Sequence, residues 1–124
     1  MSARNIVHIE IPTSNLEQSG DFYGKLFGWK ITPMPEMNYG LWEPSERPGG
    51  GFSPIGPDVA PGQVLIHVAS EDIEADLERA QTLGATVLRE KTEIPDIGWW
   101  GVFRDPSGNS MALFTGLPSQ SAAS

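Results

Sequence analysis

The stretch Val7-His8-Ile9-Glu10-Ile11 alternates apolar and ionisable side chains, and the organisation of the chain follows from it. Successive side chains of a β-strand point to opposite faces of the sheet. The three apolar side chains therefore share one face, and His8 and Glu10 share the other. The sequence predicts a first strand over residues 5–11 that presents two ionisable groups on the same side.

An amphipathic helix is predicted directly after this strand. Residues 14–17 (Ser-Asn-Leu-Glu) match the capping box, in which the hydroxyl of Ser14 caps the helix and a glutamate three residues later reaches back. Apolar residues follow at helical spacing, and Gly28 predicts a left-handed end. We expect the helix to place its aromatic side chains in the core: Phe22, Tyr23 and Phe27.

The pattern of the first half then repeats. Three strands are predicted after the first helix, and a Pro- and Gly-rich connector over residues 56–62 is followed by a second strand, helix and set of strands. Apolar residues at helical spacing mark the second helix, which ends at Gly84. The predicted segments are strands 29–32, 38–43, 49–53, 64–69, 86–88, 98–104 and 110–115, a second helix marked by Ile73, Leu77, Ala80 and Leu83, and a turn at 105–108.

Two copies of strand-helix-strand-strand-strand predict an α+β protein with one domain over residues 1–116. Its modules span about residues 5–55 and 63–116, and their curved mixed sheets are expected to enclose a cleft. Residues 117–124 are small and polar, which predicts a flexible tail.

Aligning the two helix starts gives the repeat a register. Matching residues 15–16 to residues 72–73 pairs His8 with Leu65 and Glu10 with His67. A pseudo-twofold axis between the modules would make Glu10 and His67 face each other. A slip of one residue would turn these side chains to the opposite face, so the pairing is a testable expectation.

The composition of the 124-residue chain limits the classes of molecule that it is expected to bind. It has no cysteine and a formal net charge of -8, with a pI near 4.5. The acidic balance argues against nucleic acid and against an anionic membrane, both of which attract clustered Lys and Arg. No apolar run approaches the roughly 20 residues of a membrane span, and no basic-then-apolar leader begins the chain. We expect a cytoplasmic protein.

Several motifs resemble those of one known superfamily. They are residues 8–12 (His-Ile-Glu-Ile-Pro), 21–23 (Asp-Phe-Tyr), 26–29 (Leu-Phe-Gly-Trp), 71–75 (Glu-Asp-Ile-Glu-Ala), 83–85 (Leu-Gly-Ala) and 105–109 (Asp-Pro-Ser-Gly-Asn). Over residues 5–116 the chain resembles the vicinal oxygen chelate superfamily, which includes glyoxalase I, extradiol dioxygenases, and bleomycin- and fosfomycin-resistance proteins. Residues 93–99 resemble an uncharacterised glyoxalase-like subgroup. The resemblance implies the glyoxalase/bleomycin resistance/dihydroxybiphenyl dioxygenase fold.

Members of this superfamily that use a metal take ligands from the first and last strands of each module. By position, the resemblance places His8 at the first ligand, but it places Leu65 and Ala112 at two others. Residues 49–53 offer no carboxylate or imidazole. The resemblance therefore implies that the usual metal site is absent, and the sequence favours no cofactor.

Three interpretations of the polar residues remain open. Glu10 and His67 form a paired polar couple in the sheet, or they line a cleft as ligand anchors or as a catalytic acid/base pair. Alternatively, His8, Glu10 and His67 form an irregular set of two histidines and one carboxylate, which suits Fe, Mn, Ni or Zn. We rank pairing and ligand anchoring ahead of metal binding.

The aromatic residues complete the predicted ligand site. Trp99 and Trp100 are adjacent in a strand, so they must point to opposite faces. We expect a small apolar or planar ligand in the cleft, with no defined reaction, and by analogy a homodimer. The alternatives are a metal-dependent lyase, isomerase or dioxygenase, and a protein-interaction module without a ligand. The predicted ligand-binding residues are His8, Glu10, His67, Trp42, Phe52, Trp99, Trp100 and Met111.

Overall fold

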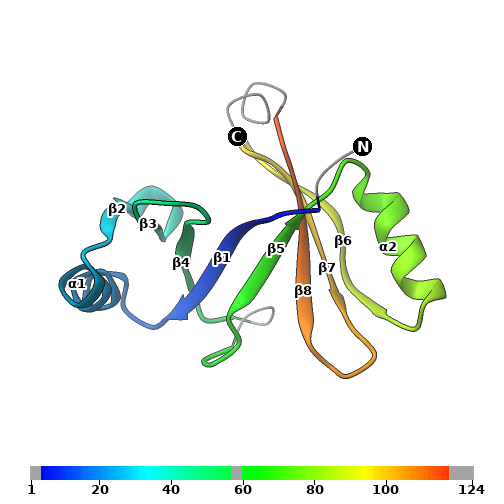
Figure 1. Cartoon of the computed structure of the whole chain (residues 1–124), viewed down its shortest axis with the longest axis horizontal. Helices are drawn as coiled ribbons and strands as arrows, with labels where there is room; N and C mark the ends of the chain where they lie inside the picture. The colour runs from blue at the N-terminus through cyan, green and yellow to red at the C-terminus, as the bar shows by residue number, and fades with distance from the viewer. Residues whose placement is uncertain (1–3, 57–59, 118–124) are drawn as a thin grey trace. The chain divides into compact units, whose positions relative to one another are not determined.

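A computed structural model describes residues 4–56 and 60–117 of the chain. Residues 57–59 of the predicted connector and residues 118–124 of the predicted tail therefore lie outside the described residues. The described chain divides into two compact units, the first unit being Ile6–Ile66 and the second unit residues 4–5 with 67–117. Figure 1 shows the elements in chain order.

Two β-α-β-β-β modules follow one another along the chain, which confirms the predicted α+β class. The first comprises β1 (Ile6–Thr13), α1 (Leu16–Phe27), β2 (Lys30–Met34), a 3-10 turn η1 (Pro35–Met37), β3 (Tyr39–Glu43) and β4 (Gly50–Pro54). The second comprises β5 (Leu65–Ala69), α2 (Ile73–Thr82), β6 (Thr86–Ile94), β7 (Gly98–Arg104) and β8 (Ser110–Gly116).

Both modules have the same strand connectivity. The first has the strand order β2-β3-β4-β1, in which β1 runs parallel to β4. The second has the order β6-β7-β8-β5, in which β5 runs parallel to β8. The remaining pairs within each module are antiparallel. Each opening strand therefore pairs with the last strand of its own module.

Helix α1 begins one residue later than the sequence predicts. Asn15 is the N-cap, and its side-chain oxygen accepts a hydrogen bond from the Gln18 backbone N–H at 3.0 Å. The capping role predicted for Ser14 is therefore wrong, because an asparagine at the next position supplies the capping oxygen. The predicted end is confirmed, since Gly28 has φ 75° and its N–H donates to the Gly24 carbonyl.

The core role predicted for Phe22 and Phe27 is wrong. Their exposed fractions are 58% and 56%, whereas Tyr23 is half-buried. Helix α1 packs on its sheet through Gly20 and Gly24, where an added Cβ would lie 3.0 Å and 3.3 Å from Ile31. Phe22 lies on the opposite side of the helix from Gly20 and is turned outward, whereas Phe27 is the last residue of α1 and its ring contacts Tyr23 and Trp29.

Helix α2 buries its apolar face more conventionally. Ile73 and Leu77 pack with Leu113 in the core of the second unit, and the residues packed around them include Val68, Val87, Trp99 and Phe103. The helix ends at Thr82, so Leu83 lies beyond it and is 63% exposed. In the described part of the chain, no helix is long and apolar enough to cross a membrane.

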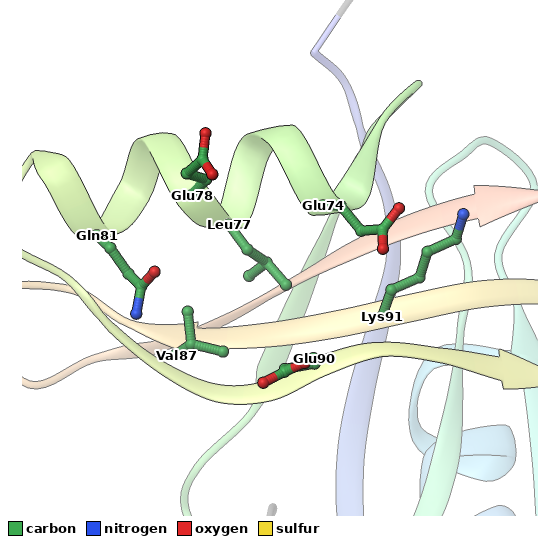
Figure 2. Close-up of a pocket in the computed structure, with 7 residues that line it drawn as sticks. All are labelled: Glu74, Leu77, Glu78, Gln81, Val87, Glu90 and Lys91. Carbon is green, nitrogen blue, oxygen red and sulfur yellow. The ribbon is translucent and has the colours of Figure 1, made fainter.

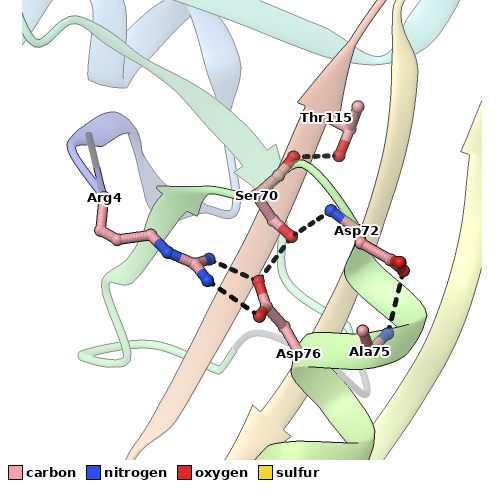
Figure 3. Close-up of polar contacts among 6 residues, drawn as sticks. All are labelled: Arg4, Ser70, Asp72, Ala75, Asp76 and Thr115. Carbon is pink, nitrogen blue, oxygen red and sulfur yellow. Dashed lines mark hydrogen bonds and ion pairs between the residues drawn. The ribbon is translucent and has the colours of Figure 1, made fainter. Parts of the chain in front are cut away.

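A polar network ties the start of the chain to α2 within the second unit (Figure 3). The Arg4 guanidinium contacts both Asp76 carboxylate oxygens, at 2.6 Å and 3.1 Å. Ser70 Oγ also donates to Asp76, and Thr115 donates to the Ser70 carbonyl. The hydrogen bond from Arg4, helped by Ser70, lowers the pKa of Asp76, although desolvation opposes this shift.

Candidate functional site

A polar cluster forms where β1 and β3 face one another across β4. His8 Nε2 lies 2.6 Å from Tyr39 Oη, and Tyr39 Oη lies 2.5 Å from Glu10 Oε2. His8 and Glu10 are 3.8 Å apart at their nearest atoms, which confirms that they share one face of β1. We call these three residues the His8–Tyr39–Glu10 cluster.

Proton positions in this cluster follow from the Tyr39 phenol. Burial, and then the charge of Glu10 and its hydrogen bond, raise the pKa of Tyr39 well above its usual range. Tyr39 therefore stays protonated and donates to Glu10, so its oxygen lone pair accepts from the His8 Nε2–H. The Glu10 carboxylate is therefore oriented by a neutral hydrogen-bond donor.

Glycine in β4 makes this arrangement possible. A Cβ on Gly51 would overlap the Tyr39 hydroxyl and the adjoining ring atoms. Gly51 pairs with Glu10 on β1 and with Leu41 on β3, so the Tyr39 side chain passes over the glycine to reach β1. Glycine in a strand is typical of such a close approach.

Tyr39 is the site residue that the sequence analysis missed. Side chains alternate along β3, and Gly40 and Trp42 lie on the face that packs against α1. Tyr39 therefore lies on the opposite face of the sheet, which no helix of the described residues covers. The signal available in the sequence was a tyrosine in one strand and consecutive glycines in the next. That signal becomes specific only once the register of β3 against β4 is known.

Trp42 and Phe52 lie in the core of the first unit, with exposed fractions of 4% and 1%. Trp42 stacks on Trp29 at 4.2 Å between ring centroids, and its indole N–H donates to the Gly51 carbonyl. Phe52 contacts the Tyr23 ring of α1. Packing inside the unit accounts for both rings, and their contact with a ligand stays a prediction.

His67 and Trp100 come together in the second unit. His67 is 5% exposed, and its ring stacks on Trp100 at 6.0 Å between centroids and 14° between planes. The Arg89 guanidinium carbon lies 4.9 Å from the centre of the Trp100 ring. We call these three residues the His67–Trp100–Arg89 cluster.

Trp99 points to the opposite face from Trp100, as the alternation of the strand requires. Trp99 packs against the α2 core, and the Lys91 ammonium lies 5.3 Å from its ring centre. Met111 is half-buried and pairs with Phe103, which also belongs to the α2 side. Glu10 lies in the first unit and His67 in the second, so their mutual pairing stays a prediction.

The ligand positions implied by the superfamily do not fit a metal ion. Leu65 and Ala112 are buried, at 2% and 0% exposure, and neither side chain carries a donor atom. The His8 Nε2 atom lies within hydrogen-bond distance of the Tyr39 hydroxyl, at 2.6 Å. Within residues 4–56 and 60–117, no three His, Cys, Asp or Glu side chains gather in a way that could hold a metal.

A groove of about 280 Å³ lies between α2 and β6 and contains none of the predicted site residues. Figure 2 shows Leu77 pointing from α2 toward the sheet and the Glu74 carboxylate leaning toward Lys91. The remaining lining residues are Glu78, Gln81, Val87 and Glu90. Acidic side chains around apolar ones are common where the edge of a helix on a sheet meets water. We assign the groove no role.

Solved structures place this architecture in a known class. Methylmalonyl-CoA epimerase from Mycobacterium tuberculosis is similar at a TM-score of 0.68 and 13% identity, over 98% of this chain and 97% of that one. A glyoxalase/bleomycin resistance protein/dioxygenase superfamily member from Vibrio splendidus 12B01 is similar at a TM-score of 0.66 and 14% identity, over 89% and 97%. At these identities the likeness shows the fold alone.

Sequence comparison then identifies the family. The family model described as "Glyoxalase-like domain" matches residues 7–114, and the chain belongs to this family. A curated relative, the anthracycline biosynthesis protein DauV from Streptomyces sp. (strain C5), is 26% identical over 85% of this chain. The chain spans 44% of the length of that relative.

Proposed function

We propose that this chain is a small-molecule-binding member of the glyoxalase-like family that acts without the metal used elsewhere in the superfamily. The observation that carries the proposal is the His8–Tyr39–Glu10 cluster. Where the superfamily resemblance implies a metal ligand, His8 donates a hydrogen bond to a phenol that in turn orients a carboxylate. In this proposal, the His8 side chain has the Tyr39 hydroxyl as its partner in place of a metal ion.

The chemistry of the cluster favours a ligand that carries a hydroxyl or N–H group. The Glu10 side chain is 13% exposed, so a donor that reaches it forms a charge-assisted hydrogen bond shielded from water. The Tyr39 hydroxyl donates to Glu10 Oε2, which fixes the direction of the carboxylate. In this proposal Glu10 is the polar anchor, and His8 and Tyr39 hold it in place.

The proposed ligand is apolar or planar. The chain is rich in tryptophan, with 4 in 124 residues. The curated relatives are named for anthracycline biosynthesis, and a planar aromatic compound agrees with that name. Planar ligands gain affinity by stacking on such side chains.

The test uses 2-naphthol, a planar probe with one hydroxyl donor, titrated by calorimetry and by tryptophan fluorescence. We expect binding to wild type and a weakening of roughly tenfold in Glu10→Gln, because one charged hydrogen bond is worth about 1.5–3 kcal/mol. Tyr39→Phe should weaken binding several-fold by releasing Glu10. Tyr23→Phe, a change to the other tyrosine of the chain, is the matched control and should bind like wild type.

The proposal is contradicted if wild type binds neither 2-naphthol nor related planar phenols. It is also contradicted if Glu10→Gln and Tyr39→Phe bind as tightly as wild type. In either case the polar cluster serves stability alone.

We further propose that the protein is a cytoplasmic homodimer, as its relatives in the superfamily commonly are. Sedimentation velocity at several protein concentrations tests the dimer. A single species of 13.4 kDa at all concentrations contradicts it.

A further inference from the structure

The exposed side of α1 carries large apolar side chains, whereas the exposed side of α2 carries polar or small ones. On α1, Phe22 and Leu26 are 58% and 59% exposed. They are four residues apart in the sequence, so their side chains lie one turn apart on the same side of the helix. On α2, the exposed residues are Glu74, Ala75, Glu78, Arg79, Gln81 and Thr82.

The packing of the first unit leaves this side of α1 open. The helix contacts β2, β3 and β4, and Gly20 and Gly24 on its inner side approach Ile31. The Phe22 ring makes an edge contact with Tyr23, at 5.1 Å between ring centroids, and still exposes more than half of its surface. Surface helices usually place polar side chains on the outer side, so exposed apolar groups there are typical of a contact with another protein surface.

Charged residues beside the apolar pair indicate which surface it contacts. Asp21 directly precedes Phe22, and Lys25 directly precedes Leu26, so both exposed charges follow the same edge of the apolar pair. The negative charge lies nearer to the start of the helix. We call Asp21, Phe22, Lys25 and Leu26 the α1 face.

The order of these charges makes the α1 face complementary to itself. A twofold axis perpendicular to the helix would bring two copies together antiparallel, with the same edge of each helix side by side. Asp21 of each copy would then face Lys25 of the other, so two opposite-charge pairs would form. A parallel arrangement would bring different edges together and would form neither pair.

We propose that the α1 face is the contact between two copies of this chain, with antiparallel helices, Phe22 and Leu26 at the centre and the two Asp21–Lys25 pairs at the rim. This inference rests on the homodimer of the proposed function and names its contact surface. A second copy meets both requirements of the face, since it brings apolar side chains to the centre and the opposite charge to each rim position. An apolar centre with a polar rim is typical of protein interfaces.

The first experiment measures the dimer dissociation constant by sedimentation velocity for wild type, Leu26→Glu and Leu83→Glu. Leu83 follows α2 and is 63% exposed, so it matches Leu26 in residue type, exposure and nearness to a helix end. We expect Leu26→Glu to raise the dissociation constant at least about tenfold, because it buries an unpaired carboxylate against apolar side chains. Leu83→Glu should dimerise like wild type. Chemical denaturation of dilute, monomeric protein should show that both variants fold.

A pair of charge reversals tests the antiparallel arrangement. Asp21→Lys places two lysines at each rim contact and Lys25→Asp places two aspartates there, so each variant alone should dimerise several-fold more weakly than wild type. In an equal mixture, the lysines of one variant meet the aspartates of the other at both rim contacts. The mixture should therefore dimerise more tightly than either variant alone, and this difference should shrink in about 1 M salt.

The inference is wrong, and the homodimer stands, if wild type and Leu26→Glu dimerise equally well or if Leu83→Glu weakens the dimer as much as Leu26→Glu. A mixture of the charge variants that is no tighter than either variant alone also overturns it. The charge variants retain the apolar centre, so they decide the question even where Leu26→Glu fails to fold. A wild type that is monomeric at every concentration refutes both the homodimer and this inference.

Discussion

The two modules share one connectivity but carry different chemistry on the sheet faces away from their helices. The first presents a carboxylate, a phenol and an imidazole, at His8, Tyr39 and Glu10. The second presents an imidazole, an indole and a guanidinium, in the His67–Trp100–Arg89 cluster. The two modules therefore combine one connectivity with different polar groups on the face away from the helix.

The last strands of the modules show how the difference is built. Strand β4 contains Gly50 and Gly51, which leave room for the Trp42 and Tyr39 side chains to cross it. The equivalent β8 has side chains at every position up to Thr115 and keeps Ala112 opposite His67. The Tyr39 hydroxyl can therefore pass over β4 to reach β1. In the second module, the side chains of β8 occupy the equivalent space.

The largest effect is expected from the contrast between a buried and an exposed phenylalanine of the first unit. Phe52→Ala should lower the free energy of unfolding by about 3–5 kcal/mol, because the ring is 1% exposed in the first unit. Phe22→Ala on the exposed side of α1 should change it by less than about 1 kcal/mol. Chemical denaturation measures both, and equal losses would mean that Phe22 is buried in solution.

The glycines of β4 give the next effect. A Cβ on Gly50 would meet the Ile9 carbonyl and the Trp42 indole, so Gly50→Ala should cost about 3 kcal/mol. Gly56→Ala is the matched control, since nothing lies within 4 Å of its added Cβ. Denaturation midpoints that agree for the two variants would refute the close approach at β4.

Gly51→Ala should cost less than Gly50→Ala, because its added Cβ meets the far end of the Tyr39 side chain, which is able to move. The double variant Gly51→Ala with Tyr39→Leu should recover part of the stability lost in Gly51→Ala. Strict additivity of the two changes would show that the residues do not interact.

The raised pKa of Tyr39 predicts a dependence on alkaline pH. A phenol whose pKa is raised above its unfolded value, near 10, stabilises the fold below that pH and loses this contribution as pH rises toward the folded pKa. The stability difference between wild type and Tyr39→Phe should therefore be about 1–2 kcal/mol at neutral pH and shrink above pH 10. A difference that does not change between about pH 7 and pH 11 would place Tyr39 in water.

The smallest effect is expected at the Arg4–Asp76 pair of the second unit. The pKa of Asp76 is lowered, so its contribution is present above the unfolded pKa, near 4, and is lost as pH falls through the folded value. Arg4 is 57% exposed, so Asp76→Asn should cost no more than about 1 kcal/mol at neutral pH. The stabilities of the two proteins should converge in an acid titration as the pH falls below the folded pKa of Asp76.

The sequence correctly predicted the features that depend on a local pattern of residues. Alternation in β1 predicts that His8 and Glu10 share a face, and Gly28 predicts the left-handed end of α1. It failed where the outcome depends on packing between elements. The outward turn of Phe22 follows from the close fit of Gly20 and Gly24 on Ile31, and Phe27 is exposed at the last position of α1.

The candidate site divides in the same way. His8, Glu10, His67 and Trp100 could be proposed from strand parity and residue type. Tyr39 could not, because its role depends on which glycine it passes over, and that is a property of register between strands. The position of Arg89 against Trp100 could not be predicted, because only the folded structure distinguishes its burial from that of the other basic residues.

The central claim is that the chain binds its ligand without a metal, through the His8–Tyr39–Glu10 cluster. The most direct test is calorimetric titration of 2-naphthol into protein dialysed against EDTA, repeated after adding one equivalent of Ni²⁺, Mn²⁺, Fe²⁺ or Zn²⁺. The account predicts the same affinity in every case and a loss of roughly tenfold in Glu10→Gln. Loss of binding in EDTA that one of these metals restores, and that His8→Ala prevents, would contradict it.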